Sequence, residues 1–192
     1  MSIRLDPVMD RNSIEVNVSD LPSTISMMRA EGCVRLSGEI YTARDAAHAR
    51  LDRLLDSGDE LPFEIKGAVI YYTGPTPGGT RLIGSCGPTT SGRMDAFTPR
   101  LYDAGLVATI GKGGRSQDVR SAIVRNGGIY LCAVGGAGAL IARHVIRVEE
   151  IAFPDLGCES IKRLTIESMP LTVGIDCYGG DIFEIGRRQY RG

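Results

Sequence analysis

The sequence predicts an α/β fold with a mixed sheet and flanking helices, and three observations favour this class. Apolar segments with strand character alternate with amphipathic helical patterns through the middle of the chain. Strand patterns dominate both ends, which indicates a mixed sheet rather than a purely parallel one. The 192 residues, 43% of them hydrophobic, can bury one sizeable core. We therefore expect residues 1–192 to form a single domain, with 1–31 as an N-terminal strand and helix extension.

The first predicted strand covers residues 13–19, where apolar and polar side chains alternate. This alternation is typical of a half-buried strand at the edge or surface of a sheet. Asp20 should cap a short helix that begins at Leu21, and Pro22 fits there because a first-turn position needs no N–H donor. We expect this helix to end near residues 30–32.

A second strand is predicted over residues 33–40, and a helix should follow it directly. Thr42 and Asp45 have the spacing of a capping box, so the helix should run over 43–55 with Arg44 in its first turn. The expected apolar face of this helix consists of Ala46, Ala49, Leu51 and Leu54.

The middle of the chain continues the alternation. Residues 67–73 are apolar almost without interruption, which predicts a strand buried on both faces. The loop over 74–79 is rich in proline and glycine and could fold over a site as a flap. A helix is expected over 90–103 with Gly105 as its stop, and a short buried strand over 106–110.

The last third should hold a helix capped by Ser116 and ended by Gly127. The glycine-rich run at 135–138 favours close packing of a small helix over a phosphate cradle. The remaining predicted elements are strands over 128–134, 145–151, 161–166 and 171–176, of which the last two form a closing pair, and the small helix that ends near residue 143.

Composition and motifs exclude several classes of function. A net charge of −1 and a pI near 6.1 give no general attraction to nucleic acid or to an anionic membrane. Residues 1–10 have no apolar run like that of a signal peptide, so we expect a soluble, cytoplasmic protein. Lys112 does not stand in a P-loop pattern, and no dinucleotide-binding glycine motif opens a helix. Serine-hydrolase chemistry is disfavoured because the only histidines are His48 and His144, and no G-x-S-x-G elbow is present.

The five cysteines are widely spaced and form no C-x-x-C pair. This spacing argues against a zinc site or an iron–sulfur cluster held by this chain alone. We expect reduced, mostly buried thiols, with Cys86 of interest because it lies in the loop before residue 90. The cysteines are Cys33, Cys86, Cys132, Cys158 and Cys177.

Three cations follow predicted strands and precede predicted helices, namely Arg44, Arg93 and Lys112. The segment over 84–95 combines glycine, proline and three hydroxyl residues before Arg93, so it suits an anion. Because the carboxyl ends of strands converge on one crevice in an open α/β sheet, the three cations could hold a small dianion. The alternative for Arg93 is that it lies in solvent or pairs with Asp95.

Several blocks of the sequence resemble one known family. The blocks are Gly38–His48, Gly74–Pro77, Gly84–Asp95, Ile110–Gly113, Gly157–Ser160 and Pro170–Val173 with Asp176. They occur in order over about residues 32–180 and are similar to the β subunit, or C-terminal domain, of class I iron–sulfur fumarases and related tartrate dehydratases.

The resemblance implies a swivelling β/β/α domain and a hydro-lyase that interconverts fumarate and (S)-malate. It also implies a 4Fe–4S cluster held by the cysteines of an α subunit and not by this chain, and a dimer of αβ units. Arg44, Arg93 and Lys112 would contact the substrate carboxylates. Thr89 would be the catalytic base or a relay, because a hydroxyl is a poor base unless its alkoxide is stabilised.

Supporting roles remain open for His48, Thr90 and Asp45. His48 could orient Arg44 or be a structural histidine. Two other functions also remain open, the β subunit of an L(+)-tartrate dehydratase and a non-catalytic dicarboxylate-binding module. In a third alternative, the loops serve only a subunit interface.

Overall fold

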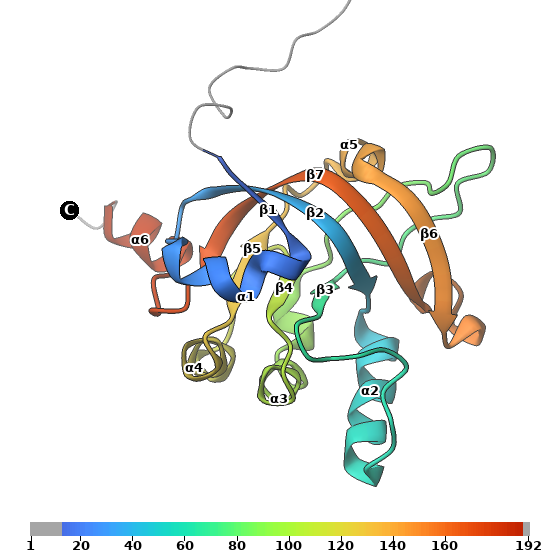
Figure 1. Cartoon of the computed structure of the whole chain (residues 1–192), viewed down its shortest axis with the longest axis horizontal. Coiled ribbons are helices and arrows are strands. Elements are labelled where there is room, and N and C mark those ends of the chain that lie inside the picture. The colour runs from blue at the N-terminus through green and yellow to red at the C-terminus, as the bar shows by residue number, and fades with distance from the viewer. Residues whose placement is uncertain (1–12, 190–192) are drawn as a thin grey trace, which may run out of the picture.

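The computed structural model describes residues 13–189, which fold around a seven-stranded mixed sheet (Figure 1). The strands are β1 (Ile14–Asn17), β2 (Cys33–Thr42), β3 (Val69–Tyr71), β4 (Ala108–Gly111), β5 (Ile129–Cys132), β6 (Val145–Ala152) and β7 (Ile161–Ile175). Their order is β1-β2-β3-β4-β5-β7-β6, and β7 also pairs with β2. Strands β1 to β5 are mutually parallel, whereas β7 is antiparallel to its three neighbours.

The additional β2–β7 pairing closes strands β2, β3, β4, β5 and β7 into a ring. A first hydrophobic core contains buried residues from all five of these strands, including Leu36, Tyr71, Ile110, Leu131 and Leu164. Closure of the ring satisfies backbone groups that an open sheet edge would leave unpaired. The predicted α/β fold with a mixed sheet is thus confirmed.

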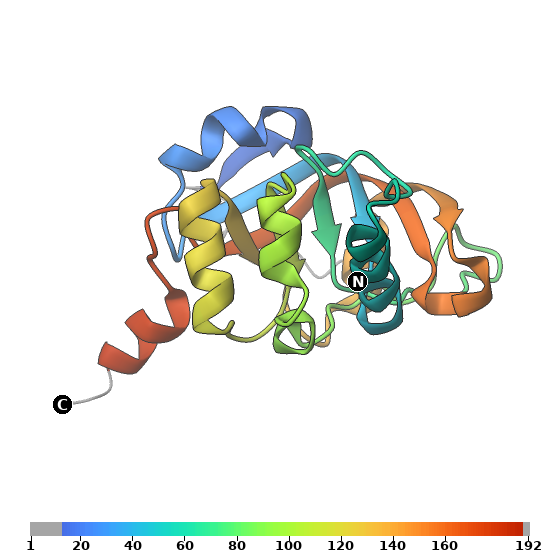
Figure 2. The same ribbon diagram turned by 90° about the horizontal axis from the view of Figure 1, so that it is seen from below.

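Helices cover the outside of the parallel strands. The α-helices are α1 (Leu21–Thr24), α2 (Asp45–Ser57), α3 (Thr98–Asp103), α4 (Gln117–Asn126), α5 (Gly138–Ile141) and α6 (Ile182–Gln189). Figures 1 and 2 show α2, α3 and α4 side by side on one face of the sheet, while α6 projects away from the body. A second hydrophobic core joins these three helices to the strands through residues such as Leu51, Leu101, Ile123 and Tyr130.

The predicted N-terminal strand is confirmed as β1, which lies at the edge of the sheet, parallel to β2. Asp20 precedes α1 as expected but makes no capping hydrogen bond with its side chain. The helical segment continues as a 3₁₀ turn over Ile25–Met27 and ends there. Residues 1–10, for which we expect no signal peptide, lie outside the described part of the chain.

The capping box predicted for α2 is wrong. Thr42 is the last residue of β2, where its hydroxyl donates to the Ser160 carbonyl at 3.3 Å and accepts from the Lys162 N–H at 3.0 Å. The helix begins at Asp45, and Arg44 is its N-cap residue without a side-chain cap. The buried residues of the helix are Ala47, His48 and Leu51, so Leu51 alone of the expected apolar face is fully buried.

The helix predicted over 90–103 is interrupted. A 3₁₀ helix, η4, covers Ser91–Met94, and α3 begins only at Thr98. Pro99 explains the interruption because it has no N–H to donate to the carbonyl of Asp95. Arg93 therefore lies in the last turn of η4 rather than in the first turn of an α-helix.

The prediction of two closing strands, over 161–166 and 171–176, is also wrong, because β7 is a single strand of 15 residues. Ser168 and Pro170 resemble turn residues, but they bend the chain without reversing it. Ser168 has φ 47° and donates its N–H to the Ser37 hydroxyl at 2.9 Å. The ends of α4 agree with the prediction, because Ser116 caps it and Gly127, with φ 63°, ends it.

Within residues 13–189, no helix has the length and apolar character needed to cross a membrane.

Candidate functional site

The candidate site lies where β2, β3 and β4 end. The segment over 89–91 inserts between the carboxyl ends of β3 and β4 and acts as a short additional strand. The Thr89 N–H donates to the Tyr72 carbonyl at 2.7 Å, and the Ser91 N–H donates to the Lys112 carbonyl at 2.8 Å. Thr90 and Lys112 form a parallel bridge. Backbone pairing thus joins the loop that carries Arg93 to the loop that carries Lys112.

Gly111 makes this close insertion possible. A Cβ atom at Gly111 would lie 2.0 Å from the Ser91 hydroxyl oxygen and 3.0 Å from a ring carbon of Tyr72. Such contacts are impossible without displacement of the segment over 89–91. The glycine is therefore required by the approach of the neighbouring segment, not by its backbone conformation.

Two of the predicted cations meet at one carboxylate. Arg93 binds Asp45 through two nitrogens, Nε to Oδ1 at 2.9 Å and Nη2 to Oδ2 at 2.8 Å. The Nε atom of Arg44 lies 3.5 Å from the same Oδ2 atom. Arg44 and Arg93 are therefore neighbours, and the alternative in which Arg93 pairs with Asp95 is excluded by the structure.

Glu159 is a residue of the site that sequence reasoning did not select. Its Oε1 lies 2.9 Å from Nη2 of Arg44, and its Oε2 accepts a hydrogen bond from the Ala46 N–H at 2.9 Å. A carboxylate at a helix N-terminus also interacts favourably with the helix dipole. Glu159 thus caps α2 in place of the expected Thr42 and holds the Arg44 guanidinium at the same time.

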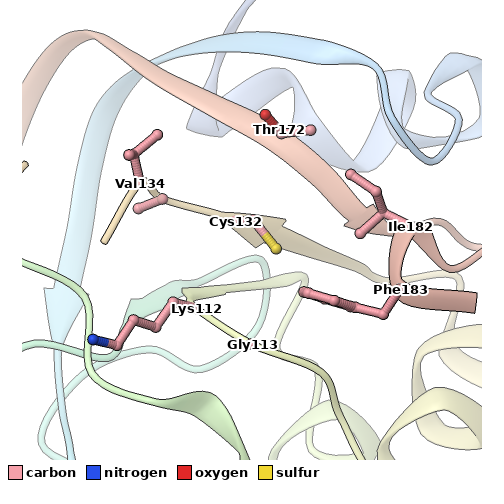
Figure 3. Close-up of a pocket in the computed structure, with 8 residues that line it drawn as sticks. Lys112, Gly113, Cys132, Val134, Thr172, Ile182 and Phe183 are labelled. Atoms are coloured by element: carbon pink, nitrogen blue, oxygen red, sulfur yellow. The ribbon is translucent and has the colours of Figure 1, made fainter. Parts of the chain in front are cut away.

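Lys112 directly follows β4. Its ammonium group has no counter-ion or hydrogen-bond partner within residues 13–189. Its side chain lines a cavity of about 300 Å³ together with Cys132, Thr172 and Phe183. Figure 3 shows the ammonium group of Lys112 at the end of this cavity opposite Phe183, whereas the thiol of Cys132 points toward the Phe183 ring. Lys112 is only half-buried, and an ammonium group without a partner is suited to an anionic ligand.

Thr89 and Thr90 lie beside these cations. Thr89 is half-buried and Thr90 is exposed. Neither hydroxyl makes a hydrogen bond with another described residue, so both are available to a ligand. The role of Thr89 as base or relay stays a prediction.

His48 is fully buried beneath Arg44. The His48 N–H and ring Nδ1 both bond to the Arg44 carbonyl, at 2.9 and 3.1 Å. Because a carbonyl only accepts, Nδ1 carries the proton, and the other ring nitrogen, Nε2, has no partner among the described residues. Burial lowers the pKa of His48 to about 4, so the ring is neutral at physiological pH.

The cysteines do not form a cluster site. Cys86 is buried, and burial raises the pKa of its thiol to about 11, which makes it unreactive. Cys158 is exposed, and the other three are partly buried, so the expectation of mostly buried thiols is only partly correct. Within the described residues, no three His, Cys, Asp or Glu side chains are grouped to hold a metal ion. These donors do not fit a 4Fe–4S cluster held by this chain.

In the glycine-rich run over 135–138, the predicted close packing is found at Gly138, the first residue of α5, whereas Gly136 has open space around it. A Cβ atom at Gly138 would lie 2.3 Å from the Ser85 hydroxyl oxygen and 2.9 Å from the Gly87 nitrogen. The loop over 74–90 is itself tied together at Thr76, whose hydroxyl accepts from the Ser85 N–H at 2.8 Å. Figures 1 and 2 show this loop, in green, extending outward beside β6. Its role as a flap stays a prediction.

The fold and the site together define an α/β domain that presents cations at the carboxyl ends of parallel strands. The family described as Fumarase C-terminus matches residues 3–186, and the chain belongs to this family.

Curated relatives from three organisms agree with this assignment. The chain is 43% identical over 153 residues to the anaerobic class I fumarate hydratase of Escherichia coli. The matched segment covers 78% of this chain and 28% of that protein. It is 40% identical over 154 residues to fumarate hydratase 2 of Leishmania major, covering 78% of this chain and 27% of that protein. It is 35% identical over 167 residues to a putative L(+)-tartrate dehydratase subunit beta of Methanocaldococcus jannaschii, covering 83% of this chain and 86% of that protein.

Proposed function

We propose that this chain is the β component of an iron–sulfur hydro-lyase that reversibly hydrates fumarate to (S)-malate. An α partner would hold the 4Fe–4S cluster, while this chain supplies the cations that bind the substrate carboxylates. The observation that carries the proposal is the meeting of Arg44 and Arg93 at Asp45. Lys112, which has no counter-ion among the described residues, is joined to the segment before Arg93 by backbone pairing.

The electrostatics of the site support a dianionic ligand. Arg44 and Arg93 are paired with two carboxylates, Asp45 and Glu159, so Lys112 would add the net positive charge that a dianion requires. Removal of a proton beside a substrate carboxylate increases negative charge there, and fixed cations stabilise that charge more strongly than they stabilise the substrate itself. Asp45 and Glu159 would hold the two arginines in place before the substrate arrives, and thereby reduce reorganisation on binding.

The name of one relative supports a partner. The chain spans 28% of the E. coli fumarate hydratase and 86% of the archaeal protein, which is named as a β subunit. Because a β subunit implies an α subunit, we propose that an α component completes the catalytic centre. Assembly as a dimer of αβ units and a location in the cytoplasm belong to the same proposal.

A second candidate is the dehydration of L(+)-tartrate, which the name of the archaeal relative favours. A third is a non-catalytic dicarboxylate-binding module. In that case the isolated chain should bind dicarboxylates on its own, and Arg44→Ala and Arg93→Ala should each weaken that binding.

Reconstitution separates these candidates. The chain would be combined anaerobically with a cluster-loaded α-type partner and assayed on fumarate, (S)-malate and tartrate side by side. We expect no turnover by either component alone, and fumarate hydration that is lost on exposure to oxygen when both are present. A preference for tartrate would support the second candidate. An inactive mixture with a verified cluster would contradict the proposal.

A further inference from the structure

Arg115 is a buried cation that the proposed function does not use. Its side chain is 0% exposed, yet it forms an ion pair with Asp95, Nε to Oδ1, at 2.7 Å. Its Nη2 donates to the Thr98 hydroxyl at 2.9 Å and to the Tyr72 hydroxyl at 3.3 Å, and its Nη1 donates to Thr109 at 3.2 Å. The guanidinium is therefore fixed by partners on three sides.

The pair connects the two loops that carry Arg93 and Lys112. Asp95 follows η4 directly, and Arg115 stands three residues after Lys112. The second oxygen of Asp95 accepts from the Ser116 N–H at 2.6 Å, so this carboxylate binds both the backbone and the side chain of the opposite loop. A movement of one loop would have to break this connection or carry the other loop with it.

Two tyrosines strengthen the same connection. The Arg115 guanidinium lies 5.2 Å from the ring centroid of Tyr72 and 5.0 Å from that of Tyr130. The Tyr130 hydroxyl donates to the Gly113 carbonyl at 2.8 Å and lies 2.9 Å from the Ser91 hydroxyl oxygen. Tyr130 thus also joins the η4 segment to the loop after β4.

Stability alone is a weak explanation for this arrangement. Removing two charges from water is costly, and a buried ion pair is often no more stabilising than apolar side chains of the same size. What a largely buried pair with several hydrogen bonds does provide is a fixed geometry. Here the geometry concerns the two loops on which the proposed substrate contacts stand.

We infer that Arg115 and Asp95 are positioning residues that set the distance between the Arg93 and Lys112 side chains. The inference rests on the proposed function for its catalytic consequence, but not for the coupling of the two loops. A displacement of about 1 Å at a binding group can reduce turnover by about 100-fold, so such coupling would matter for catalysis.

The coupling can be measured in the full chain by hydrogen exchange with mass spectrometry. Arg115→Lys keeps a positive charge for Asp95 but cannot reach Thr98, Tyr72 and Thr109 together. We expect exchange to become about 10-fold faster in peptides covering 89–95 and 111–116 together. Asp95→Asn, a milder change, should produce the same pattern.

A matched control is Arg125→Lys. Arg125 binds Asp103 through two nitrogens at 2.8 and 2.6 Å, but this pair is exposed and joins α3 to α4 away from the site. The Arg125→Lys variant should leave hydrogen exchange unchanged in the peptides covering 89–95 and 111–116. The inference is overturned if Asp95→Asn and Arg115→Lys accelerate only one of the two peptides, neither of them, or all peptides of the chain equally.

The catalytic consequence is measured in the reconstituted complex. Arg115→Lys should raise KM for fumarate about 10-fold, whereas a merely structural residue would lower the amount of active complex and leave KM unchanged. Arg125→Lys should keep the wild-type KM. If the wild-type complex does not hydrate fumarate, the proposed function fails, and the exchange experiment still decides whether the loops are coupled.

Discussion

Single residues in this site are defined by what surrounds them rather than by their own chemistry. His48 is neutral because burial disfavours the imidazolium form, and its ring lies 5.2 Å from Tyr72 and 6.0 Å from Phe97, measured between ring centroids. Its two bonds to the Arg44 carbonyl fix the backbone from which that guanidinium extends. This geometry fits the interpretation that His48 orients Arg44, and a structural role would use the same contacts.

The buried state of His48 predicts a pH dependence of stability. The pKa is about 4 in the folded chain against an ordinary value of 6.5, so the unfolded chain binds the proton more readily between these values. The stabilisation is fully present above pH 6.5 and is lost as the pH falls toward 4. With about 1.4 kcal/mol per pKa unit, the loss is on the order of 3 kcal/mol.

His48→Asn should remove this contribution while keeping an amide that can donate to the Arg44 carbonyl. Urea unfolding between pH 4 and 7 should show a smaller slope of the free energy of unfolding against pH in this variant. His144→Asn is the matched control, because His144 also bonds to a backbone carbonyl but is partly exposed. Equal slopes for His48→Asn and the wild type would show that His48 is not the titrating group.

At the scale of elements, local signals predicted α4 correctly and α2 incorrectly. Ser116 and Gly127 act on residues close to them in sequence, so the sequence contains the whole signal. The α2 cap instead comes from Glu159, which lies 113 positions from Ala46. The Thr42 hydroxyl is bonded to the backbone of Ser160 and Lys162 and is not available as a cap. No capping pattern in the sequence could reveal this exchange.

The same limit applies to the candidate site. Arg44, Arg93 and Lys112 could be placed at strand ends from the order of elements alone. Their carboxylate partners could not be predicted. Asp45 contacts both arginines and Glu159 contacts Arg44 because of the way α2 packs against the turn before β7. The link between Arg115 and Asp95 likewise depends on the η4 turn, which the sequence pattern suggested would be regular helix.

The unusual cap of α2 leads to a prediction. Glu159→Gln keeps an oxygen that can accept from the Ala46 N–H, whereas Glu159→Ala removes the cap entirely. We expect Glu159→Ala to lower the free energy of unfolding by about 1 kcal/mol more than Glu159→Gln, measured by urea denaturation. If both variants are equally destabilised, Glu159 contributes only through its charge on Arg44.

At the scale of the whole molecule, the closed ring of strands provides a rigid base and leaves the cations at one edge. Arg44 follows β2, whereas Arg93 and Lys112 lie on segments between β3 and β4 and after β4, which backbone pairing holds in register. Among the described residues, no three His, Cys, Asp or Glu side chains are grouped to hold a metal ion.

If Arg44, Arg93 and Lys112 bind one dicarboxylate together, a crystal structure of the reconstituted complex with (S)-malate will show it. We expect nitrogen atoms of all three side chains within about 3 Å of the malate carboxylate oxygens. Malate bound elsewhere, or without contact to all three cations, would show that they do not form one binding site.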